Sequence, residues 1–230
     1  MSGNVHGGHR DRMKRRYLEQ GLEGFDDHEA LELLLFYAIG RADVNPLAHR
    51  LLERFGSFRG VLDADPAELT EVEGVGQSAA LLLRLIKDMN RRYLLDVQAA
   101  EKRLHLKKAE ASGRFFMPHF YGLREERVYA AFLDDKLLLL SCRLLTEGGI
   151  SAVPVNMRKL VEAAIREKAT GVILAHNHPA GQAVPSVEDR EATAKITAAL
   201  ESVQIRLLDH IIVAGGEYVS MAECGYFQKK

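Results

Sequence analysis

The sequence predicts an α+β protein, with an N-terminal all-α domain followed by an α/β domain that contains a mixed sheet. Three observations predict this class. Apolar residues recur at helical spacing from about residue 26 to residue 105, strand-like runs alternate with helical runs from residue 126 onwards, and the texture changes in between. We therefore expect one domain over residues 1–105 and a second over residues 106–230.

The composition is that of an ordinary globular protein. Of the 230 residues, 47% are apolar and 27% are charged, which supplies enough apolar material for a buried core and excludes wholesale disorder. The 31 basic and 32 acidic residues give a net charge of −1, so the chain as a whole has no attraction toward nucleic acid or an anionic membrane.

Three further features predict a cytoplasmic protein with no membrane partner. The longest apolar run, Leu33 to Ile39, is far shorter than the roughly 20 residues that span a bilayer. The first residues lack the apolar segment of a secretory signal. Cys142 and Cys224 show no Cys-x-x-Cys spacing, so we expect two free thiols rather than a metal clip.

The first half carries start signals for several helices. Residues 1–16 are polar and then basic, and we expect a solvated terminus there rather than a nucleic-acid-binding arm. Beyond them, a capping Asp or Asn, often followed by proline, predicts where helices begin. The expected helices run from Asp26 or Asp27 to Ala38, from Asn45-Pro46 to near Gly56, from Asp65-Pro66, and from Ser78.

The second half alternates strands with helices. Residues 106–125 are mixed in character and hold the expected domain junction. The expected strands cover residues 128–133, 137–145, 172–175, 205–214 and 218–219, and the expected helices cover residues 156–169 and 186–202.

The most informative stretch follows the apolar strand at residues 172–175. His176 and His178 are two residues apart, and alternate side chains of an extended chain point to the same side, so both imidazoles can reach one ion. Asp189 follows on the next helix, after a loop with Gly and Pro that can fold back. Two histidines and one carboxylate leave the fourth position of zinc open to water, which is the pattern of a catalytic Zn²⁺ site.

These residues also have a structural interpretation. A single histidine is usually structural, although two histidines at this spacing at a strand end are harder to explain in that way. Ser186 and Asp189 stand three residues apart at a helix start, as in a capping box. Both interpretations hold together if Asp189 caps the helix and also binds the metal.

The same stretch resembles a known motif. His-x-His, followed after ten residues by Asp, with Ser three residues before that Asp, is similar to the JAMM metalloprotease motif of JAB/MPN domains. The longer run from Val172 to Pro179, with Gly181, Pro185-Ser186 and the run from Leu208 to Val213, resembles the RadC (UPF0758) family. The resemblance covers most of the second half closely and the first half more loosely.

The resemblance implies a JAB/MPN-like, cytidine-deaminase-like domain and zinc-assisted hydrolysis of a peptide or isopeptide substrate, with a link to DNA repair. The residues alone leave open whether Glu125 or Glu126 points at the metal, and the resemblance selects Glu126 as the general base. It also implies that Ser186 hydrogen-bonds the developing oxyanion. The chain departs from the usual sequence pattern of the family at Ala180 and over residues 145–150. Neither departure touches one of the three ligands, but both bear on substrate preference.

Gly74-Val75-Gly76, between two expected helices, resembles a helix-hairpin-helix loop. Such a loop presents backbone N–H groups to a phosphate, and this contact is independent of base sequence. The alternative is a plain joint between helices, or a hairpin that binds protein. Because Glu71 and Glu73 precede the loop and the nearest cation in the sequence is Arg84, we expect weak, non-specific DNA binding at most.

The leading hypothesis is therefore a RadC-like zinc-dependent hydrolase. The alternative is a DNA-associated accessory protein with a non-catalytic metal site. A metal-dependent nuclease is a third hypothesis, which the shortage of carboxylates for a two-metal site disfavours.

Overall fold

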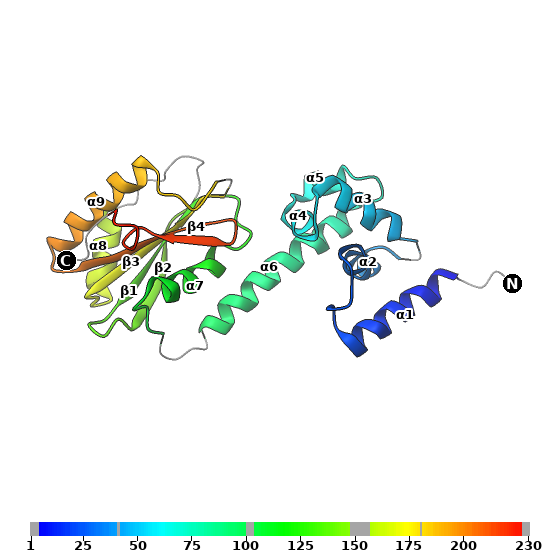
Figure 1. The fold of residues 1–230 in the computed structure, drawn as a ribbon, viewed down its shortest axis with the longest axis horizontal. Helices are drawn as coiled ribbons and strands as arrows, with labels where there is room; N and C mark the ends of the chain where they lie inside the picture. The colour runs from blue at the N-terminus through cyan, green and yellow to red at the C-terminus, as the bar shows by residue number, and fades with distance from the viewer. Residues whose placement is uncertain (1–4, 41, 100–103, 148–156, 180, 227–230) are drawn as a thin grey trace. The chain divides into compact units, whose positions relative to one another are not determined.

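The computed structural model describes residues 5–40, 42–99, 104–147, 157–179 and 181–226. The chain divides into two compact units, Met1–Asn90 and Arg91–Lys230, and Figure 1 labels their helices and strands. Ala180 and residues 148–150, where the sequence departs from the family wording, lie outside the described residues.

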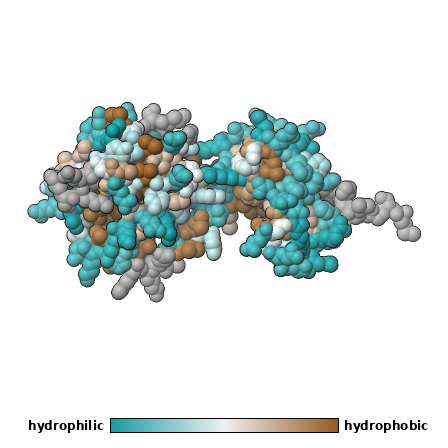
Figure 2. Space-filling model, in the orientation of Figure 1, coloured by the Kyte–Doolittle hydropathy of each residue, from teal (hydrophilic) through white to brown (hydrophobic). Residues whose placement is uncertain are grey.

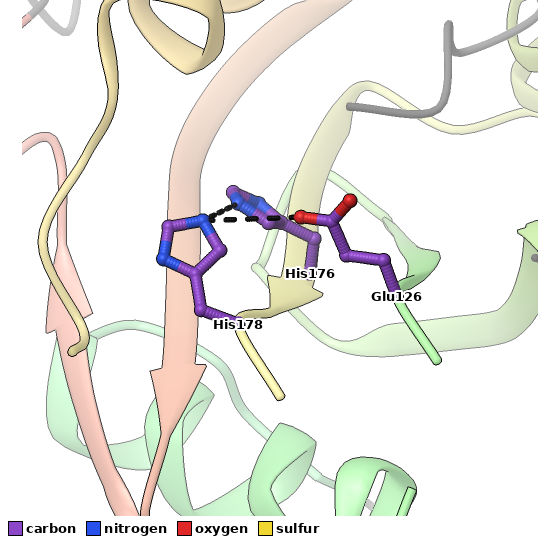
Figure 3. Close-up of side chains that lie close together, drawn as sticks. All are labelled: Glu126, His176 and His178. Carbon is purple, nitrogen blue, oxygen red and sulfur yellow. Dashed lines mark hydrogen bonds and ion pairs between the residues drawn. The ribbon is translucent and has the colours of Figure 1, made fainter. Parts of the chain in front are cut away.

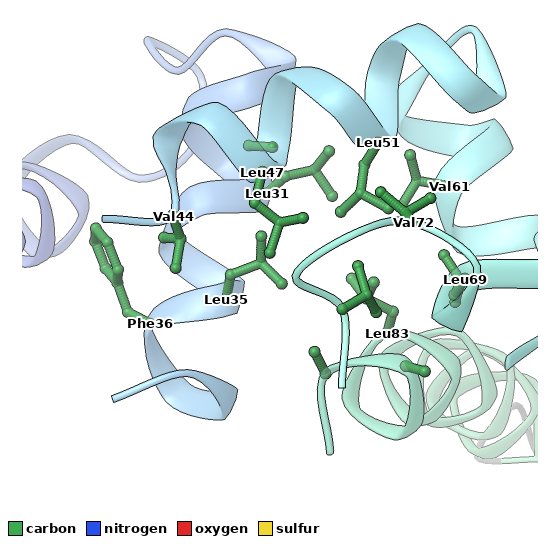
Figure 4. Packing of buried hydrophobic residues seen from close by; sticks show 14 of the residues in the cluster. Leu31, Leu35, Phe36, Val44, Leu47, Leu51, Val61, Leu69, Val72 and Leu83 are labelled. Carbon is green, nitrogen blue, oxygen red and sulfur yellow. The ribbon is translucent and has the colours of Figure 1, made fainter. Parts of the chain in front are cut away.

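The first unit is helical. Its helices bury one apolar face each in a shared core, which includes Leu31, Leu35, Leu51, Leu69 and Leu83 (Figure 4). They are α1 (Val5–Gln20), α2 (Asp27–Ala38), α3 (Asn45–Phe55), α4 (Phe58–Asp63), α5 (Pro66–Thr70) and α6 (Gln77–Ala99), the last of which ends in the second unit.

Local start and stop signals explain most of these helix boundaries. Asp26 and Asp65 are N-caps of α2 and α5, and each forms a capping box with a glutamate three residues later. Gly56 ends α3 in the left-handed region at φ 79°, which glycine adopts without strain. The expectation that Asn45 caps α3 is wrong, because the N-cap is Val44 and the Asn45 carboxamide donates to Glu32 Oε2 at 3.2 Å.

The expectation of a solvated N-terminus is also wrong, because α1 packs against the rest of the first unit. Met13 is buried in the helical core. Arg10 donates to the carbonyl oxygens of Ile39 and Ala42 at 2.8 and 2.7 Å. Arg16 donates to both carboxylate oxygens of Glu29 at 2.8 and 2.7 Å. The basic residues thus hold α1 to α2 and to the chain that follows it.

The second unit contains a five-stranded mixed sheet in the order β2-β1-β3-β4-β5. Only the β3–β4 pair is parallel among the described strands, and the other neighbours are antiparallel. The strands are β1 (Arg127–Leu133), β2 (Leu139–Glu147), β3 (Gly171–Asn177), β4 (Arg206–Ala214) and β5 (Glu217–Ser220). This sheet, after the helical first half, confirms the predicted α+β class.

Helices cover both faces of the sheet (Figure 1). One buried cluster joins α7 (Ala109–Phe120) to alternate residues of β1, β3 and β4. The other joins α8 (Met157–Arg166) and α9 (Val187–Glu201) to the intervening residues. In β3, Ile173 and Ala175 face the first cluster, while Val172 and Leu174 face the second. Because side chains alternate along a strand, His176 also lies on the face that α9 covers.

No helix was expected over residues 106–125, yet α7 lies there and supplies Phe115, Phe116 and Phe120 to the core. Gly113 and Pro118 are poor helix formers, so the sequence pattern did not indicate this helix. Gly113 lies under the Tyr218 ring, where an added Cβ would stand 2.5 Å from ring carbons. Pro118 lies within the last turn. Close packing, rather than helix propensity, therefore explains the glycine.

One irregularity in the sheet affects the site. The β3–β4 pairing shifts between Val172, which pairs with Leu207, and Ile173, which pairs with Asp209. Leu208 is the extra residue and packs with the α7 cluster, as does Ile211. The shift is a β-bulge that resets the alternation of β4.

Within the described residues, no helix combines the length and apolar character needed to cross a bilayer. The face drawn in Figure 2 is mostly hydrophilic, with small hydrophobic patches between the polar side chains. Patches of this kind are normal on a folded protein.

Candidate metal centre

Two histidines meet at the carboxyl end of β3. His176 lies in the strand, and the backbone N–H of His178 donates to the Val213 carbonyl at 2.9 Å, which keeps the chain extended beyond the last strand residue. Both imidazoles therefore point to the same side, and their Nε2 atoms lie 2.9 Å apart (Figure 3).

Helix α9 brings Asp189 to the same point. Its Oδ1 lies 3.2 Å from His176 Nε2, and its Oδ2 lies 3.4 Å from His178 Nε2. A capping box at the helix start orients this carboxylate, because the Ser186 N–H donates to Asp189 Oδ2 at 2.8 Å and the Ser186 hydroxyl accepts from the Asp189 N–H at 3.0 Å. Asp189 thus caps α9 and still directs an oxygen at each histidine.

The donor set fits a small divalent cation. Ligands about 2.0–2.1 Å from a tetrahedral zinc stand roughly 3.3 Å apart, and the separations here are 2.9, 3.2 and 3.4 Å. His178 Nδ1 lies 3.0 Å from the Gln182 carbonyl, which can only accept, so in the neutral imidazole the Nε2 lone pair faces the other ligands. Lone pairs and a carboxylate packed this closely repel one another unless a proton or a metal ion lies between them.

The charges of Asp189 and the two histidines also favour a bound cation. Burial works against ionisation of Asp189, yet hydrogen bonds from His176 and His178 outweigh it and hold the pKa of the carboxyl well below its usual range. The same contact with Asp189 raises the pKa of His178. The site therefore favours a positive charge beside an ionised carboxylate.

Glu126 lies directly before β1 and faces the histidines (Figure 3). Its Oε1 is 4.0 Å from His178 Nε2, and one ligand atom from each of Glu126, His176 and His178 lies within 4.8 Å of the others. Its Oε2 is buried and has no hydrogen-bond partner among the described residues. Glu125, the alternative that the residues alone left open, is exposed. The structure therefore brings Glu126 to the candidate site.

The structure also adds residues to which the sequence assigned no role. His210 of β4 lies 2.8 Å from His176, Nε2 to Nδ1, and Thr193 of α9 contacts His210 in turn. His210 stood in the run that resembles the family, but only the fold shows what it touches. Asn177 bonds to the backbone on both sides of Glu126.

The loop Gly74-Val75-Gly76 joins α5 to α6 in the first unit. Gly74 has a positive φ of 97°, Val75 is buried, and the Val75 N–H is already used by the Val72 carbonyl at 3.0 Å. Arg50 of α3 is distant from this loop in the sequence but lies beside it in the structure. Its guanidinium donates to the Glu73 carbonyl at 3.0 Å, so a cation is present that the sequence did not indicate.

Comparison with known proteins defines the class of the second unit. Residues 106–226 match the family model described as a RadC-like JAB domain. The chain is 36% identical over 215 residues to a UPF0758 protein of Aliivibrio fischeri, covering 94% of this chain and 95% of that one. A UPF0758 protein of Rhodobacter capsulatus is 36% identical over 90% of this chain and 96% of its own length, and one of Bordetella petrii is 37% identical over 94% and 95%. The chain belongs to the RadC (UPF0758) family, which confirms the resemblance drawn from its motifs.

Proposed function

We propose that the protein is a zinc-dependent hydrolase that cleaves a peptide or isopeptide amide. The observation that carries the proposal is the convergence of His176, His178 and Asp189, with donor atoms 2.9–3.4 Å apart, beside a second carboxylate that is not needed as a ligand. When bound, zinc lowers the pKa of a water toward neutrality and polarises the scissile carbonyl.

Glu126 is the general base of this proposal. A buried carboxylate oxygen without a partner is costly, and within the part of the chain that the structure describes Glu126 Oε2 is such an atom. A water or a substrate N–H in the site would satisfy it. Glu126 would take a proton from the attacking water and deliver it to the leaving amine.

Ser186 is the proposed donor to the developing oxyanion. Its hydroxyl is fixed at the start of α9 by the bond from the Asp189 N–H. That bond uses a lone pair of the hydroxyl oxygen and not its hydrogen, so the O–H can donate toward a substrate oxygen.

The decisive experiment compares Glu126→Gln with Glu125→Gln in the full chain. Gln keeps the size of Glu but cannot accept a proton at neutral pH, so Glu126→Gln should keep its zinc and its fold and lose about 10²–10⁴-fold in turnover. Glu125→Gln, an adjacent and exposed position, is the matched control and should turn over normally. Turnover must first be found with a screen of peptide and isopeptide substrates.

Two results would contradict the proposal. Wild-type turnover by Glu126→Gln, with chelation still abolishing it, would place the base elsewhere. If no amide substrate shows any chelator-sensitive turnover, the hydrolase assignment fails and the accessory-protein hypothesis takes its place.

A further inference from the structure

A buried chain of polar groups connects the back of the candidate metal centre to helix α9. His176 Nδ1 lies 2.8 Å from His210 Nε2, and His210 Nδ1 lies 2.7 Å from Thr193 Oγ1. Thr193 Oγ1 in turn donates to the Asp189 carbonyl, one helical turn earlier, at 2.6 Å. His176, His210 and Thr193 are all buried.

The number of hydrogens available determines which group donates in each of these hydrogen bonds. The Asp189 carbonyl can only accept, so the single hydroxyl hydrogen of Thr193 is used there. Among the described residues the other acceptor near Thr193 is Met221 Sδ, at 3.6 Å, and a thioether sulfur is a weak acceptor. Toward His210 the hydroxyl therefore accepts, and His210 Nδ1 must carry the hydrogen.

The direction passes on to His176. His210 is buried, which favours the neutral imidazole with one N–H. With its hydrogen on Nδ1, His210 accepts at Nε2, so His176 donates from Nδ1. In the neutral His176 imidazole the lone pair is then on Nε2, the atom that lies 3.2 Å from Asp189 Oδ1 and 2.9 Å from His178 Nε2.

We propose that Thr193 and His210 are positioning residues that set the tautomer of His176, so that its Nε2 lone pair is directed at the metal. This inference rests on the proposed metal site and deepens it. A metal-binding histidine usually donates its other N–H to a carboxylate, a carbonyl or a water, any of which accepts without further arrangement. Here the acceptor is a second imidazole, which accepts at that nitrogen in only one tautomer, and Thr193 selects that tautomer.

This series of hydrogen bonds starts and ends at Asp189. It begins at the backbone carbonyl of Asp189 and ends at the His176 imidazole, which faces the Asp189 carboxylate. The first turns of α9 therefore supply both a candidate ligand and the group that orients another ligand.

The first test exchanges Thr193. Thr193→Val keeps the shape and removes the hydroxyl, so zinc affinity measured by chelator competition should fall about 10–100-fold. Thr193→Ser restores the hydroxyl and should recover the wild-type affinity. Thr197→Val is the matched control, because Thr197 makes the same type of bond on the same helix, to the Thr193 carbonyl at 2.8 Å. It should bind zinc as the wild type does.

The second test reads the tautomer directly in the metal-free full chain. Long-range ¹H–¹⁵N NMR should find the hydrogen of His210 on Nδ1 in the wild type and in Thr193→Ser, and redistributed to Nε2 in Thr193→Val. This readout does not depend on the stability of any variant, because the wild-type spectrum alone decides the direction of the chain.

The outcomes separate the inference from the proposed function. A wild-type His210 that carries its hydrogen on Nε2 would overturn the inference, and so would unchanged zinc affinity in a folded Thr193→Val. A wild type that binds no zinc would refute the proposed metal site, while the NMR measurement would still test the direction of the hydrogen bonds.

Discussion

The side chain of Asn177 holds the backbone on both sides of Glu126. Its Oδ1 accepts from the Arg127 N–H at 2.9 Å, and its Nδ2 donates to the Glu125 carbonyl at 3.1 Å. Asn177 is buried at the end of β3, between the two histidines in sequence. The strand that carries the candidate ligands therefore also positions the candidate base.

We expect Asn177→Ala to loosen Glu126 without removing a ligand. Two hydrogen bonds in a partly buried region are lost, so the free energy of unfolding should fall by about 0.5–1.5 kcal/mol for each bond. Turnover per folded molecule should also fall, while the zinc content stays near that of the wild type. Gln98→Ala is a suitable control, because the Gln98 carboxamide also bonds to backbone, at the Arg114 and Phe115 carbonyls. A similar loss of turnover in both variants would contradict the positioning role.

The zinc content of the purified protein tests the ligand set. We expect about one zinc per chain, as in a site with three protein ligands and one open position. His178→Ala should lose most of it, since the Nε2 atom is removed from the centre of the cluster. His49→Ala, at an exposed position in the helical unit, should retain it. Elemental analysis that finds full occupancy in His178→Ala would show that the assignment is wrong.

The stability of the second unit should depend on pH through His119. Burial lowers the pKa of His119 to about 4, and its ring packs between Phe115 and Tyr129. Because the unfolded chain, with a pKa near 6.5, binds this proton more readily, stability is complete above about pH 6.5 and is lost as the pH falls toward 4. The loss amounts to about 3 kcal/mol from this group.

Chemical denaturation between those pH values provides the measurement. His119→Gln should flatten the dependence, and His105→Gln, at an exposed position, should leave it unchanged. If His119→Gln keeps the full slope, another group is responsible for the pH dependence.

We expect the loop Gly74-Val75-Gly76 to bind DNA weakly and without sequence preference. Arg50 supplies a cation, but Glu71 and Glu73 flank the same loop, and Arg54 is paired with Glu71 at 3.5 Å. Binding of the full chain should therefore lie in the non-specific range of about 10⁻⁴–10⁻⁶ M, with a shallow dependence on salt. Fluorescence anisotropy should also show tighter binding for Glu73→Lys. Nanomolar, steeply salt-dependent binding by the wild type would refute this expectation.

Interactions within a few residues were predictable from the sequence. The capping boxes that start at Asp26, Asp65 and Ser186 lie within single turns, and the same-side placement of His176 and His178 follows from the geometry of an extended chain. The three predicted ligands do lie together, while their metal stays a prediction.

Contacts between distant segments were not predictable in this way. The cationic residues of α1 looked like a solvated tail because their partners, such as Glu29 and the carbonyl of Ile39, lie on other elements. The pairing of Thr193 with His210 arises because α9 packs on β4, which no local pattern encodes. Counting alternate residues along β4 from Leu208 would place His210 on the α7 face, whereas it contacts α9.

The extra residue in β4 has a consequence for how the family can vary in length. Since Leu207 already pairs with Val172 and Asp209 with Ile173, a chain without Leu208 would have a regular ladder at this point and would keep His210 opposite Leu174. Leu208 packs over Gly171, where an added Cβ would stand 2.5 Å from Leu208 Cδ1, so a shorter strand would also relax the need for glycine there. Position 208 is thus a place where a related chain could lose one residue without disturbing the histidines, and position 171 could then carry a side chain larger than glycine.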